Sequence, residues 1–439
     1  MGGRRLPKGE SDRYGSGGGC GCDPSAGAIV LFYAYVPLVD PAAVVSRLRL
    51  ACERGGVTGK LRVASEGING TAAGPDAGVD ALIRALATDP EPALAAAAKT
   101  LDYKREPGCA HLFPAGLSVR LVPEIVPFCR PVAVPNANPL GAPDDAPSTS
   151  ASIAARVEHL DPHAFHREVL AAAATSNPST SPSRSSPSAA PPLVLDVRNY
   201  YESRVGRFDG AVLAPIRRFS QLPEWCEAHP ELFRGRRVLM YCTGGIRCEK
   251  AARWLAASET CAPASVAQLR GGVAAYARDV VHSETQTEKE KETEAEAGIG
   301  DRPHGQKNER PPGSSSASGF EPATGSCSRS AFRGANFVFD ARGLARVTDD
   351  VVGWCDGCGV AADRVGACAS VGCHKILVVC ESCEMKDAKV RCCAACAAQD
   401  SESEATGEET ETGRRRRRRT PCDCDGYASR ERRLRPRAE

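Results

Sequence analysis

The sequence predicts a multidomain protein of mixed α/β and α+β class. Two stretches, 28–128 and 153–280, alternate strand-like and helix-like hydrophobic patterns, and a third, 332–398, is dense in cysteine. Alternating strands and helices favour layered α/β architectures, whereas closely spaced cysteines favour a module held together by metal. The tracts outside these stretches are rich in Gly, Ser, Pro or charge, so we expect them to be disordered or to act as linkers. They are 1–27, 129–152, 281–331 and 399–439.

Composition narrows the class of protein. The chain has 439 residues and a net charge of +2, so nucleic-acid binding would depend on local basic patches. No apolar run reaches 18 residues and the N-terminus lacks the apolar segment of a secretory signal, so we expect no membrane association and no secretion. In a reducing, cytoplasmic setting the 21 cysteines indicate metal binding or catalysis. The Arg414–Arg419 run suits an RNA-binding tail, a nuclear address or a featureless tail equally.

The first stretch has the element order of a ferredoxin-like domain, β-α-β-β-α-β. Its first helix has clear boundaries, with Asp40 as the N-cap, Pro41 in the first turn and Gly55 as the stop. The expected elements are a buried strand, a helix, two strands around a glycine turn, a second helix and a last strand, at 28–38, 40–56, 57–74, 76–90 and 117–128.

The second stretch predicts an α/β domain with a parallel sheet, because buried strands alternate with helices. A Ser/Pro-rich insert at 175–191 interrupts it. The expected elements are a helix, two buried strands, a second helix and a strand–turn–helix unit, at 153–173, 192–202, 236–242, 248–258 and 265–278.

The segment YCTGGIRCEK, residues 241–250, carries the most specific chemistry. Cys242 ends a strand, a glycine turn follows, and a helix begins just after it, so backbone N–H groups, the helix dipole and Arg247 all favour a thiolate. We therefore expect Cys242 to be a nucleophile with a lowered pKa. A phosphatase loop needs five residues between Cys and Arg, and this one has four, so a phosphatase is disfavoured. The loop residues are Thr243, Gly244, Gly245, Ile246 and Arg247.

Cys248 lies six residues after Cys242 in the first turn of the expected helix. It is a candidate resolving cysteine that could form a disulfide with an oxidised or persulfurated Cys242. An ordinary helix residue is an equally good interpretation, and the sequence leaves the two open.

Several segments resemble a known family. LDVRNYYE, YCTGGIRCEKAARWL and QLRGGVAAY are similar to rhodanese (sulfurtransferase) motifs. Together with ASEGINGT, NFVFDARG and the cysteine-rich stretch, they resemble the rhodanese-domain tRNA uridine hydroxylases. The resemblance implies a rhodanese fold for 153–280, a loop cysteine at 242 that can carry a persulfide, and oxygen-dependent hydroxylation of the wobble uridine to 5-hydroxyuridine. It implies tRNA as the partner. The residues show no flavin or haem signature.

Two further groups of residues are expected to support the Cys242 site. Asp196 and Arg198 match the DVR strand end of the rhodanese family, and a structural ion pair is the favoured interpretation. The SEGINGT turn supplies Ser65, Glu66 and Asn69, which could support the Cys242 loop, close over a nucleotide, or serve turn geometry alone.

The cysteine-rich stretch predicts two structural zinc sites, because three CxxC pairs and one CxxxxC pair supply eight thiolates for two tetrahedral ions. An interleaved pairing joins 355/358 with 380/383 and 368/373 with 393/396, leaving Cys392 and His374 spare. The expected ligands are Cys355, Cys358, Cys368, Cys373, Cys380, Cys383, Cys393 and Cys396.

Basic and histidine residues near the site are less specific. Six arginines flank it in sequence; each alone is expected on a solvated face, and together they could form a rim for RNA phosphates. They are Arg204, Arg207, Arg217, Arg218, Arg236 and Arg237. His159, His163 and His166 have helical spacing and are expected at the surface.

The residues permit three functions. The first is the tRNA hydroxylase, with molecular oxygen as co-substrate. The second is a sulfurtransferase that moves sulfur from thiosulfate or a persulfide donor through Cys242. The third is an interaction protein built around the zinc module with an inert rhodanese domain, which retention of Cys242, its glycines and Arg247 disfavours. Oligomeric state and tRNA species do not follow from the sequence.

Overall fold

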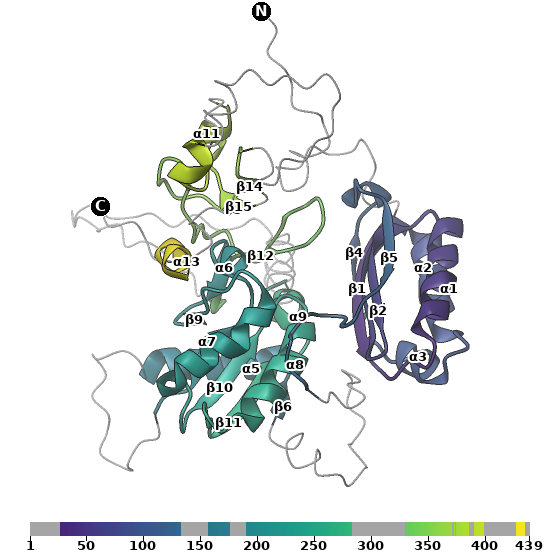
Figure 1. The fold of residues 1–439 in the computed structure, drawn as a ribbon, viewed down its shortest axis with the longest axis horizontal. Helices are drawn as coiled ribbons and strands as arrows, with labels where there is room; N and C mark the ends of the chain where they lie inside the picture. Colours follow the sequence, from purple (N-terminus) through teal and green to yellow (C-terminus); the bar gives the residue numbers. More distant parts are fainter. Residues whose placement is uncertain are drawn as a thin grey trace, which may run out of the picture.

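The computed structural model describes residues 27–132, 157–175, 190–282, 330–370, 373, 375–385, 390–398 and 427–434. Figure 1 shows an N-terminal domain in purple and blue, a central domain in teal, and a C-terminal module in green beside the central domain. The segments expected to be disordered, together with His374 and the poly-Arg run, lie almost entirely outside the described residues. Within the described part, no helix has the length and apolar character needed to cross a membrane.

The N-terminal domain has the ferredoxin-like order predicted from the sequence, with one strand added. Its sheet order is β4-β1-β3-β2-β5, antiparallel except where β2 and β5 pair in parallel. Asp40 caps the first helix by accepting from the Ala43 amide, as expected. The elements are β1 Gly27–Tyr35, α1 Pro41–Arg54, β2 Thr58–Ala64, β3 Gly67–Pro75, α2 Asp76–Ala87, α3 Pro92–Ala98, β4 Lys104–Pro107, η3 Ala110–Leu112 and β5 Leu117–Leu121.

The last strand of this domain differs from the prediction. The ferredoxin-like position beside β1 is filled by β4, whose sequence is KREP, while 117–121 adds to the opposite edge as β5. β4 is a short edge strand with three exposed residues, so it has no hydrophobic alternation to reveal it. The alternating pattern of 117–128 is real, but it belongs to an extra strand and a following irregular segment.

The two faces of this sheet have different partners, which explains why β1 is buried almost throughout. Val30, Phe32 and Ala34 pack with the helices in one hydrophobic core. Because side chains alternate along a strand, Tyr33 and Tyr35 point to the other face, where they pack with Ile246 of the central domain. Figure 1 shows the helices α1–α3 on the side of the sheet away from the central domain.

The central domain is built on a five-stranded parallel sheet of order β6-β11-β10-β7-β9, confirming the predicted class. Strand β6 is not predicted; it is four residues long and lies inside the 153–173 stretch, where the sequence predicts only a helix. The elements are β6 Val157–Leu160, α5 Pro162–Thr175, β7 Leu193–Asp196, α6 Tyr200–Ser203, β8 Gly206–Phe208, β9 Val212–Leu213, η4 Phe219–Gln221, α7 Leu222–Ala228, η5 Pro230–Leu232, β10 Arg237–Tyr241, α8 Ile246–Ala257, β11 Ser265–Leu269, α9 Gly272–Tyr276 and η6 Ala277–His282.

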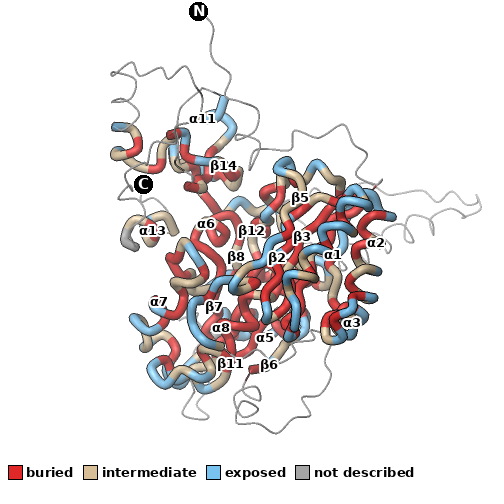
Figure 2. The backbone as a smooth tube through the Cα atoms, turned by 45° about the vertical axis from the view of Figure 1, so that its right-hand side comes forward, coloured by how far each residue is buried: buried red, intermediate tan, exposed pale blue. Residues whose placement is uncertain are grey.

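Each face of the parallel sheet has its own core. Side chains of α7 and α8 pack on one face with Leu195, Val238 and Met240. On the other face α5 and α9 pack with Leu239 and Tyr241. In Figure 2 the buried residues, in red, include both the strands of this sheet and the helices that pack on it. The arrangement brings the carboxyl end of β10, and hence Cys242, to the edge of the sheet that faces the N-terminal domain.

The C-terminal module begins inside the central domain, because β12 pairs antiparallel with β8. The 399–439 tail was expected to be disordered throughout, and this is wrong for 427–434, which form helix α13. Arg433 of α13 donates to Asp356 Oδ1 at 2.5 Å, a tertiary contact that composition alone does not reveal. The elements are β12 Phe332–Phe337, β13 Leu344–Arg346, β14 Val365–Ala367, β15 Ile376–Val378, α11 Glu381–Met385 and α13 Tyr427–Leu434.

Candidate active site

Cys242 follows β10 directly and is fully buried at the base of a tight loop. The Gly245 amide donates to its Sγ at 3.1 Å. Burial alone would raise the pKa of this thiol, but the Cys248 thiol, the Arg247 charge and the backbone amides of both residues outweigh burial and lower it to about 5. A pKa of about 5 favours the thiolate at neutral pH, the state that the sequence predicts for Cys242.

Glycine is required at two positions around this loop. Gly245 has φ +101°, and a Cβ there would lie 2.8 Å from the Tyr33 hydroxyl. Gly272, from the QLRGG motif, has φ +65°, and a Cβ there would lie 2.5 Å from the Cys242 carbonyl oxygen and 2.7 Å from the Gly244 amide. The loop is thus enclosed between α9 and the N-terminal sheet, with no room for larger residues.

Arg247 is held beside the loop by a buried carboxylate that the sequence analysis did not single out. Its guanidinium donates to both Glu202 oxygens at 2.7 Å, and Glu202 has no exposed surface. Thr243 Oγ1 donates to Glu202 at 3.1 Å and accepts from Arg247 at 3.0 Å. Glu202 is the last residue of the LDVRNYYE motif, so its place in that motif could have identified it as a site residue. The bidentate pair fixes the cation that favours the thiolate.

Asp196 and Arg198 form the structural ion pair favoured from the sequence. Both are fully buried; Arg198 Nη2 donates to Asp196 at 2.7 Å and to the Gly206 carbonyl at 2.6 Å. The Tyr241 hydroxyl also donates to Asp196, at 2.8 Å. Although burial opposes ionisation, Arg198 keeps the pKa of Asp196 below its ordinary value. The pair ties β7 to β10 immediately before the Cys242 loop.

Cys248 is also fully buried and hydrogen bonds to Cys242. Burial, and then the neighbouring thiolate, raise the pKa of Cys248 well above its ordinary value. At neutral pH the pair is therefore one thiolate and one thiol, with Cys248 as the donor. This arrangement is compatible with a resolving role, which stays a prediction.

The SEGINGT turn contacts the helix that begins at the loop. Glu66 Oε1 accepts from Lys250 Nζ at 2.9 Å, and Glu124 accepts from the same buried ammonium at 2.6 Å. Asn69 Nδ2 donates to the Ile125 carbonyl at 3.1 Å. The Ser65 side chain is exposed, and the residue contributes its carbonyl to the Leu38 amide. Of the alternatives left open, Glu66 supports α8 through Lys250.

His159 is not the plain surface residue that was expected. Its Nε2 lies 3.2 Å from both oxygens of Glu249, which is almost fully buried in α8. The Tyr33 hydroxyl donates to the same carboxylate at 3.4 Å. Burial opposes ionisation of Glu249, but His159 and Arg253 lower its pKa. The sequence around His159 cannot reveal this contact, because Glu249 lies 90 positions away and the two meet only in the folded protein.

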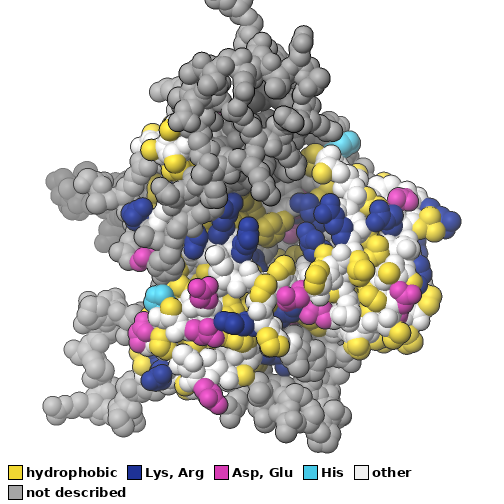
Figure 3. Space-filling model, viewed as in Figure 1, with side chains coloured by type: hydrophobic (Ala, Val, Ile, Leu, Met, Phe, Trp, Pro, Cys, Tyr) yellow, Lys and Arg dark blue, Asp and Glu magenta, His cyan; other side chains and the backbone are white. Residues whose placement is uncertain are grey.

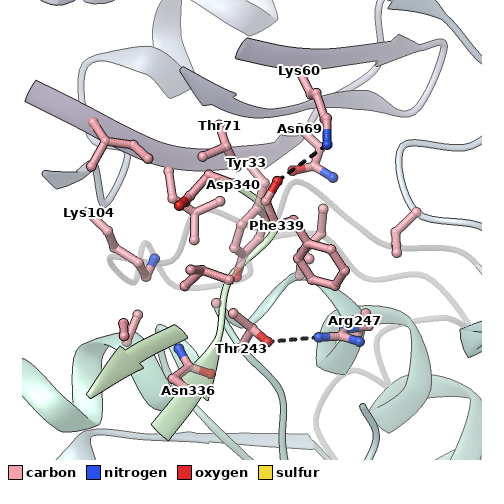
Figure 4. A pocket seen from close by; sticks show the side chains of 18 of the residues that line it. Tyr33, Lys60, Asn69, Thr71, Lys104, Thr243, Arg247, Asn336, Phe339 and Asp340 are labelled. Carbon is pink, nitrogen blue, oxygen red and sulfur yellow. Dashed lines mark hydrogen bonds between the residues drawn. The ribbon is translucent and has the colours of Figure 1, made fainter. Parts of the chain in front are cut away.

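A cavity of about 840 Å³ lies between the N-terminal sheet, the Cys242 loop and the β12–β13 hairpin. Thr243, Gly244 and Arg247 line it, so it ends beside the cysteine. Ten lining residues are Lys or Arg and two are acidic: Lys60, Arg62, Lys104, Arg105, Arg217, Arg218, Arg247, Arg278, Arg342 and Arg346, with Glu106 and Asp340. Figure 3 shows basic side chains on both sides of the hollow, and Figure 4 shows its interior. Six of these cations are paired with carboxylates: Lys104, Arg105, Arg247, Arg278, Arg342 and Arg346. The lining still has more basic than acidic residues, which favours an anionic ligand.

The six arginines expected near the site divide into two groups. Arg217 and Arg218 line the cavity. Arg204 is buried against Asp356, and Arg207 is half-buried with its guanidinium on backbone carbonyls. Arg236 donates to the Pro191 carbonyl, while Arg237 pairs with Glu158 and Glu168. Apart from Arg247 in the loop itself, the remaining cations of the cavity come from other segments of the chain, which proximity in sequence to Cys242 did not identify.

The cysteine-rich module contains two clusters suited to metal ions, in each of which the four sulfur atoms lie within 4.8 Å of one another. The first consists of Cys355, Cys358, Cys380 and Cys383, the predicted set. The second consists of Cys368, Cys373, Cys392 and Cys396, so Cys392 takes the place expected for Cys393. Four sulfurs at this spacing match a closed tetrahedral site, which is structural rather than catalytic.

The correction from Cys393 to Cys392 has a local cause. Cys392 Sγ lies 3.2 Å from Cys396 Sγ and 3.8 Å from Cys373 Sγ, and its amide donates to Cys368 Sγ at 3.3 Å. These contacts place the Cys392 sulfur in the cluster, two residues before the short helical turn 394–398 begins. The familiar CxxC spacing favoured Cys393 in the sequence.

The first cluster is connected to the Cys242 loop. Asp356, next to Cys355, accepts from Arg204 at 2.7 Å, and Arg204 also donates to the Trp354 carbonyl at 2.9 Å. Arg204 directly follows α6, the helix that carries Glu202. Two buried ion pairs, that of Glu202 on α6 and that of Arg204 directly after it, therefore link the module to Arg247.

The fold and the enclosed thiolate define a rhodanese-like protein with two accompanying modules. Three families match separate stretches: the UPF0176 acylphosphatase like domain over 27–125, the rhodanese-like domain over 184–279, and the rhodanase C-terminal family over 333–397. A solved structure, that of BlrB, a BLUF protein in its dark state, is 28% identical over 23% of this chain and 74% of that chain, but its TM-score of 0.18 supports no inference.

The curated relatives identify the family. The tRNA uridine(34) hydroxylase of Agrobacterium fabrum is 34% identical over 58% of this chain and 68% of its own length. That of Cytophaga hutchinsonii is 27% identical over 82% and 86%, respectively. That of Bacillus pumilus is 32% identical over 57% of this chain, which covers 64% of that relative, slightly under two thirds. The chain belongs to the tRNA uridine(34) hydroxylase family.

Proposed function

We propose that this protein hydroxylates the uridine at position 34 of tRNA to 5-hydroxyuridine, using the Cys242 thiolate. The supporting observation is the position of that thiolate, with a pKa of about 5, at the end of a cavity lined by ten basic residues. An anionic polynucleotide suits such a cavity, and the relatives carry the name of this activity.

Individual residues have distinct roles in this proposal. Cys242 supplies the reactive sulfur, and the Gly245 amide and Arg247 stabilise negative charge on it. Glu202 and Thr243 position Arg247. Because Cys242 is fully buried in this conformation, the residues around its loop must rearrange before a base can reach Sγ.

The chemistry requires an oxidant, for which we propose molecular oxygen. Replacing the C5 hydrogen of uracil by hydroxyl removes two electrons; one oxygen atom enters the product and the other leaves as water, consuming two protons and two further electrons. A dithiol supplies those two electrons when it becomes a disulfide. Cys242 and Cys248 are such a pair, already hydrogen bonded, and an external thiol would then reduce their disulfide.

We further propose zinc for both cysteine clusters and the cytoplasm as the location. Four cysteine ligands in a closed set suit zinc and leave no position for a substrate. All the cysteines that the structure describes are free thiols, with no disulfide among them. Free thiols are typical of a reducing compartment.

The test uses the purified full-length chain, an unmodified tRNA transcript, a thiol reductant and ¹⁸O₂. The proposal expects 5-hydroxyuridine that contains one ¹⁸O atom, measured by nucleoside mass spectrometry, and none with Cys242→Ser. Thiocyanate formation from thiosulfate and cyanide is measured in parallel. Rapid, Cys242-dependent thiocyanate formation without any 5-hydroxyuridine would favour the sulfurtransferase instead.

A further inference from the structure

The cavity wall formed by the N-terminal sheet carries an oriented hydrogen-bond acceptor. Asn69 lies on β3 and lines the cavity. Since its side chain donates to the Ile125 carbonyl at 3.1 Å, the atom near Ile125 must be the amide nitrogen. The Oδ1 atom is then the group that remains for a ligand. Figure 4 shows this side chain among those at the cavity surface.

A cationic donor lies beside this acceptor. Arg62 on β2 is directly opposite Asn69 in the antiparallel register, so the two side chains emerge next to each other on the same face. Arg62 also lines the cavity, and among the described residues it has no carboxylate partner. The guanidinium is always charged and only donates. The wall therefore presents an acceptor and a donor side by side.

An aromatic ring lies close to these groups. Phe339 belongs to the β12–β13 hairpin and is 41% exposed in the cavity, which is unusual for a large apolar side chain. Its carbonyl accepts from Lys60 at 3.3 Å, and its ring centroid lies 6.0 Å from the Arg247 guanidinium. Phe339 thus lies between the N-terminal sheet and the Cys242 loop, as Figure 4 shows.

The hairpin that carries this ring is fixed to the N-terminal domain. The Ala341 amide donates to the Leu112 carbonyl at 2.9 Å, and Arg342 pairs with Glu106 at 2.5 Å. The ring is therefore presented by an anchored segment rather than a free loop end. Exposed aromatic rings in basic grooves are stacking platforms for unpaired bases.

We propose that this wall is a uracil-binding subsite. The Phe339 ring stacks on the base, Asn69 Oδ1 accepts from N3–H, and Arg62 donates to the O4 carbonyl oxygen. The subsite rests on the proposed function, which brings a uridine into the cavity. Cytosine reverses both edge groups, because its N3 is an acceptor and its N4 amino group a donor. With cytosine in the subsite, the acceptor Asn69 Oδ1 would face the acceptor N3, and the donor Arg62 would face the donor amino group. Polar groups that lose their hydrogen-bond partners in this way lower the binding affinity.

The test is a binding experiment that needs no turnover. Two anticodon stem-loop RNAs differ only at position 34, U or C, and their Kd values for the full-length Cys242→Ser chain are measured by fluorescence anisotropy at one salt concentration. We expect the U RNA to bind tighter by about tenfold or more, given the cost of unpaired polar groups. In the same background, Asn69→Ala should reduce the preference to about twofold or less.

Further variants separate the roles. Arg62→Gln should lower the U preference, whereas Arg84→Gln, which removes a charge from exposed helix α2 of the same domain, should not. Phe339→Ala should weaken both RNAs by about tenfold with the preference unchanged, and Phe339→Trp should restore binding. Arg62 is exposed, so its variant remains informative if the Asn69 variant does not fold.

Equal affinity of the Cys242→Ser chain for the two RNAs would overturn the subsite while leaving hydroxylation to be judged by its own product. Equal weakening of both RNAs by Asn69→Ala would also overturn it, since Asn69 would then act only as an anchor for Ile125. Failure of both RNAs to bind would contradict the proposed function as well.

Discussion

The Cys242 loop and the two cysteine clusters use the same side chain under opposite conditions. Cys242 is a buried sulfur stabilised by a backbone amide, a thiol and a buried guanidinium. In each cluster four sulfurs lie within 4.8 Å of one another, an arrangement that could hold a metal ion. The comparison shows that the neighbours of a cysteine, rather than its exposure, decide whether it forms a single stabilised thiolate or joins a cluster that could hold a metal ion.

The largest expected effect separates the two regions completely. Cys242→Ser should reduce 5-hydroxyuridine formation by at least about a thousandfold, because the reactive sulfur is lost. Metal content, measured by elemental mass spectrometry of the purified chain, should stay at two ions. A variant that also lost a metal ion would break the distinction between the regions.

The reciprocal change is Cys380→Ser in the first cluster. We expect one metal ion per chain to be lost and the thermal unfolding midpoint to fall, since metal binding contributes folding free energy. Through Asp356, Arg204 and the helix carrying Glu202, the pH midpoint of Cys242 alkylation should also rise. Peptide mass spectrometry after alkylation at several pH values gives that midpoint; an unchanged value would show that the link between the regions is passive.

The buried cation of the loop can be tested by itself. Glu202→Gln leaves Arg247 buried without its partner and should lower the free energy of unfolding by about 3–5 kcal/mol. The matched control is Glu158→Gln, which breaks a half-exposed pair with Arg237 and should cost about 1 kcal/mol or less. Urea unfolding measures both, and equal losses would contradict the assignment of a buried pair to the loop.

A smaller effect concerns pH. The folded Cys242 loses its proton near pH 5, whereas an unfolded cysteine keeps it to about pH 9, so the unfolded state binds more protons between these values. The contribution of Cys242 to the free energy of unfolding should therefore increase from pH 5 to 9 and be lost as pH falls through 5. Urea unfolding of the chain and of Cys242→Ser at several pH values isolates it; parallel curves would contradict the lowered pKa.

Cys248→Ala tests the thiolate itself, apart from the electron supply that the proposed reaction also takes from Cys248. Removing the thiol that hydrogen bonds to Cys242 should raise the pKa of Cys242 above 5 but leave it below its ordinary value, because Arg247 and the loop amides remain. Alkylation of Cys242 against pH measures the change. A midpoint at the ordinary value of a free cysteine would mean that Cys248 dominates the thiolate.

The sequence predicted the parts of the molecule whose chemistry is local. The Cys242 loop, the Asp40-capped helix and the first cysteine cluster could each be predicted because their residues are adjacent or regularly spaced. Strand β4 was missed because an exposed edge strand has no hydrophobic pattern. Cys393 was chosen over Cys392 because spacing cannot show which side of a helical turn faces the metal.

Contacts between distant segments could not be predicted. Nothing near Glu249 in the sequence indicates His159, and nothing near Cys242 indicates that Tyr33 covers its loop. The basic cavity is assembled from three parts of the chain, so the arginines adjacent in sequence to the site gave only two of its ten cations, apart from Arg247 itself. Such sites depend on docking between domains, which leaves no periodic signal in either one.

The most direct test of the central claim is nucleoside mass spectrometry of tRNA from cells that lack 5-hydroxyuridine and express this chain or its Cys242→Ser variant. The account predicts 5-hydroxyuridine at position 34 with the unaltered chain and none with the variant, at equal protein levels. Equal amounts of 5-hydroxyuridine with both chains, or none with either, would contradict the claim that the Cys242 thiolate hydroxylates tRNA.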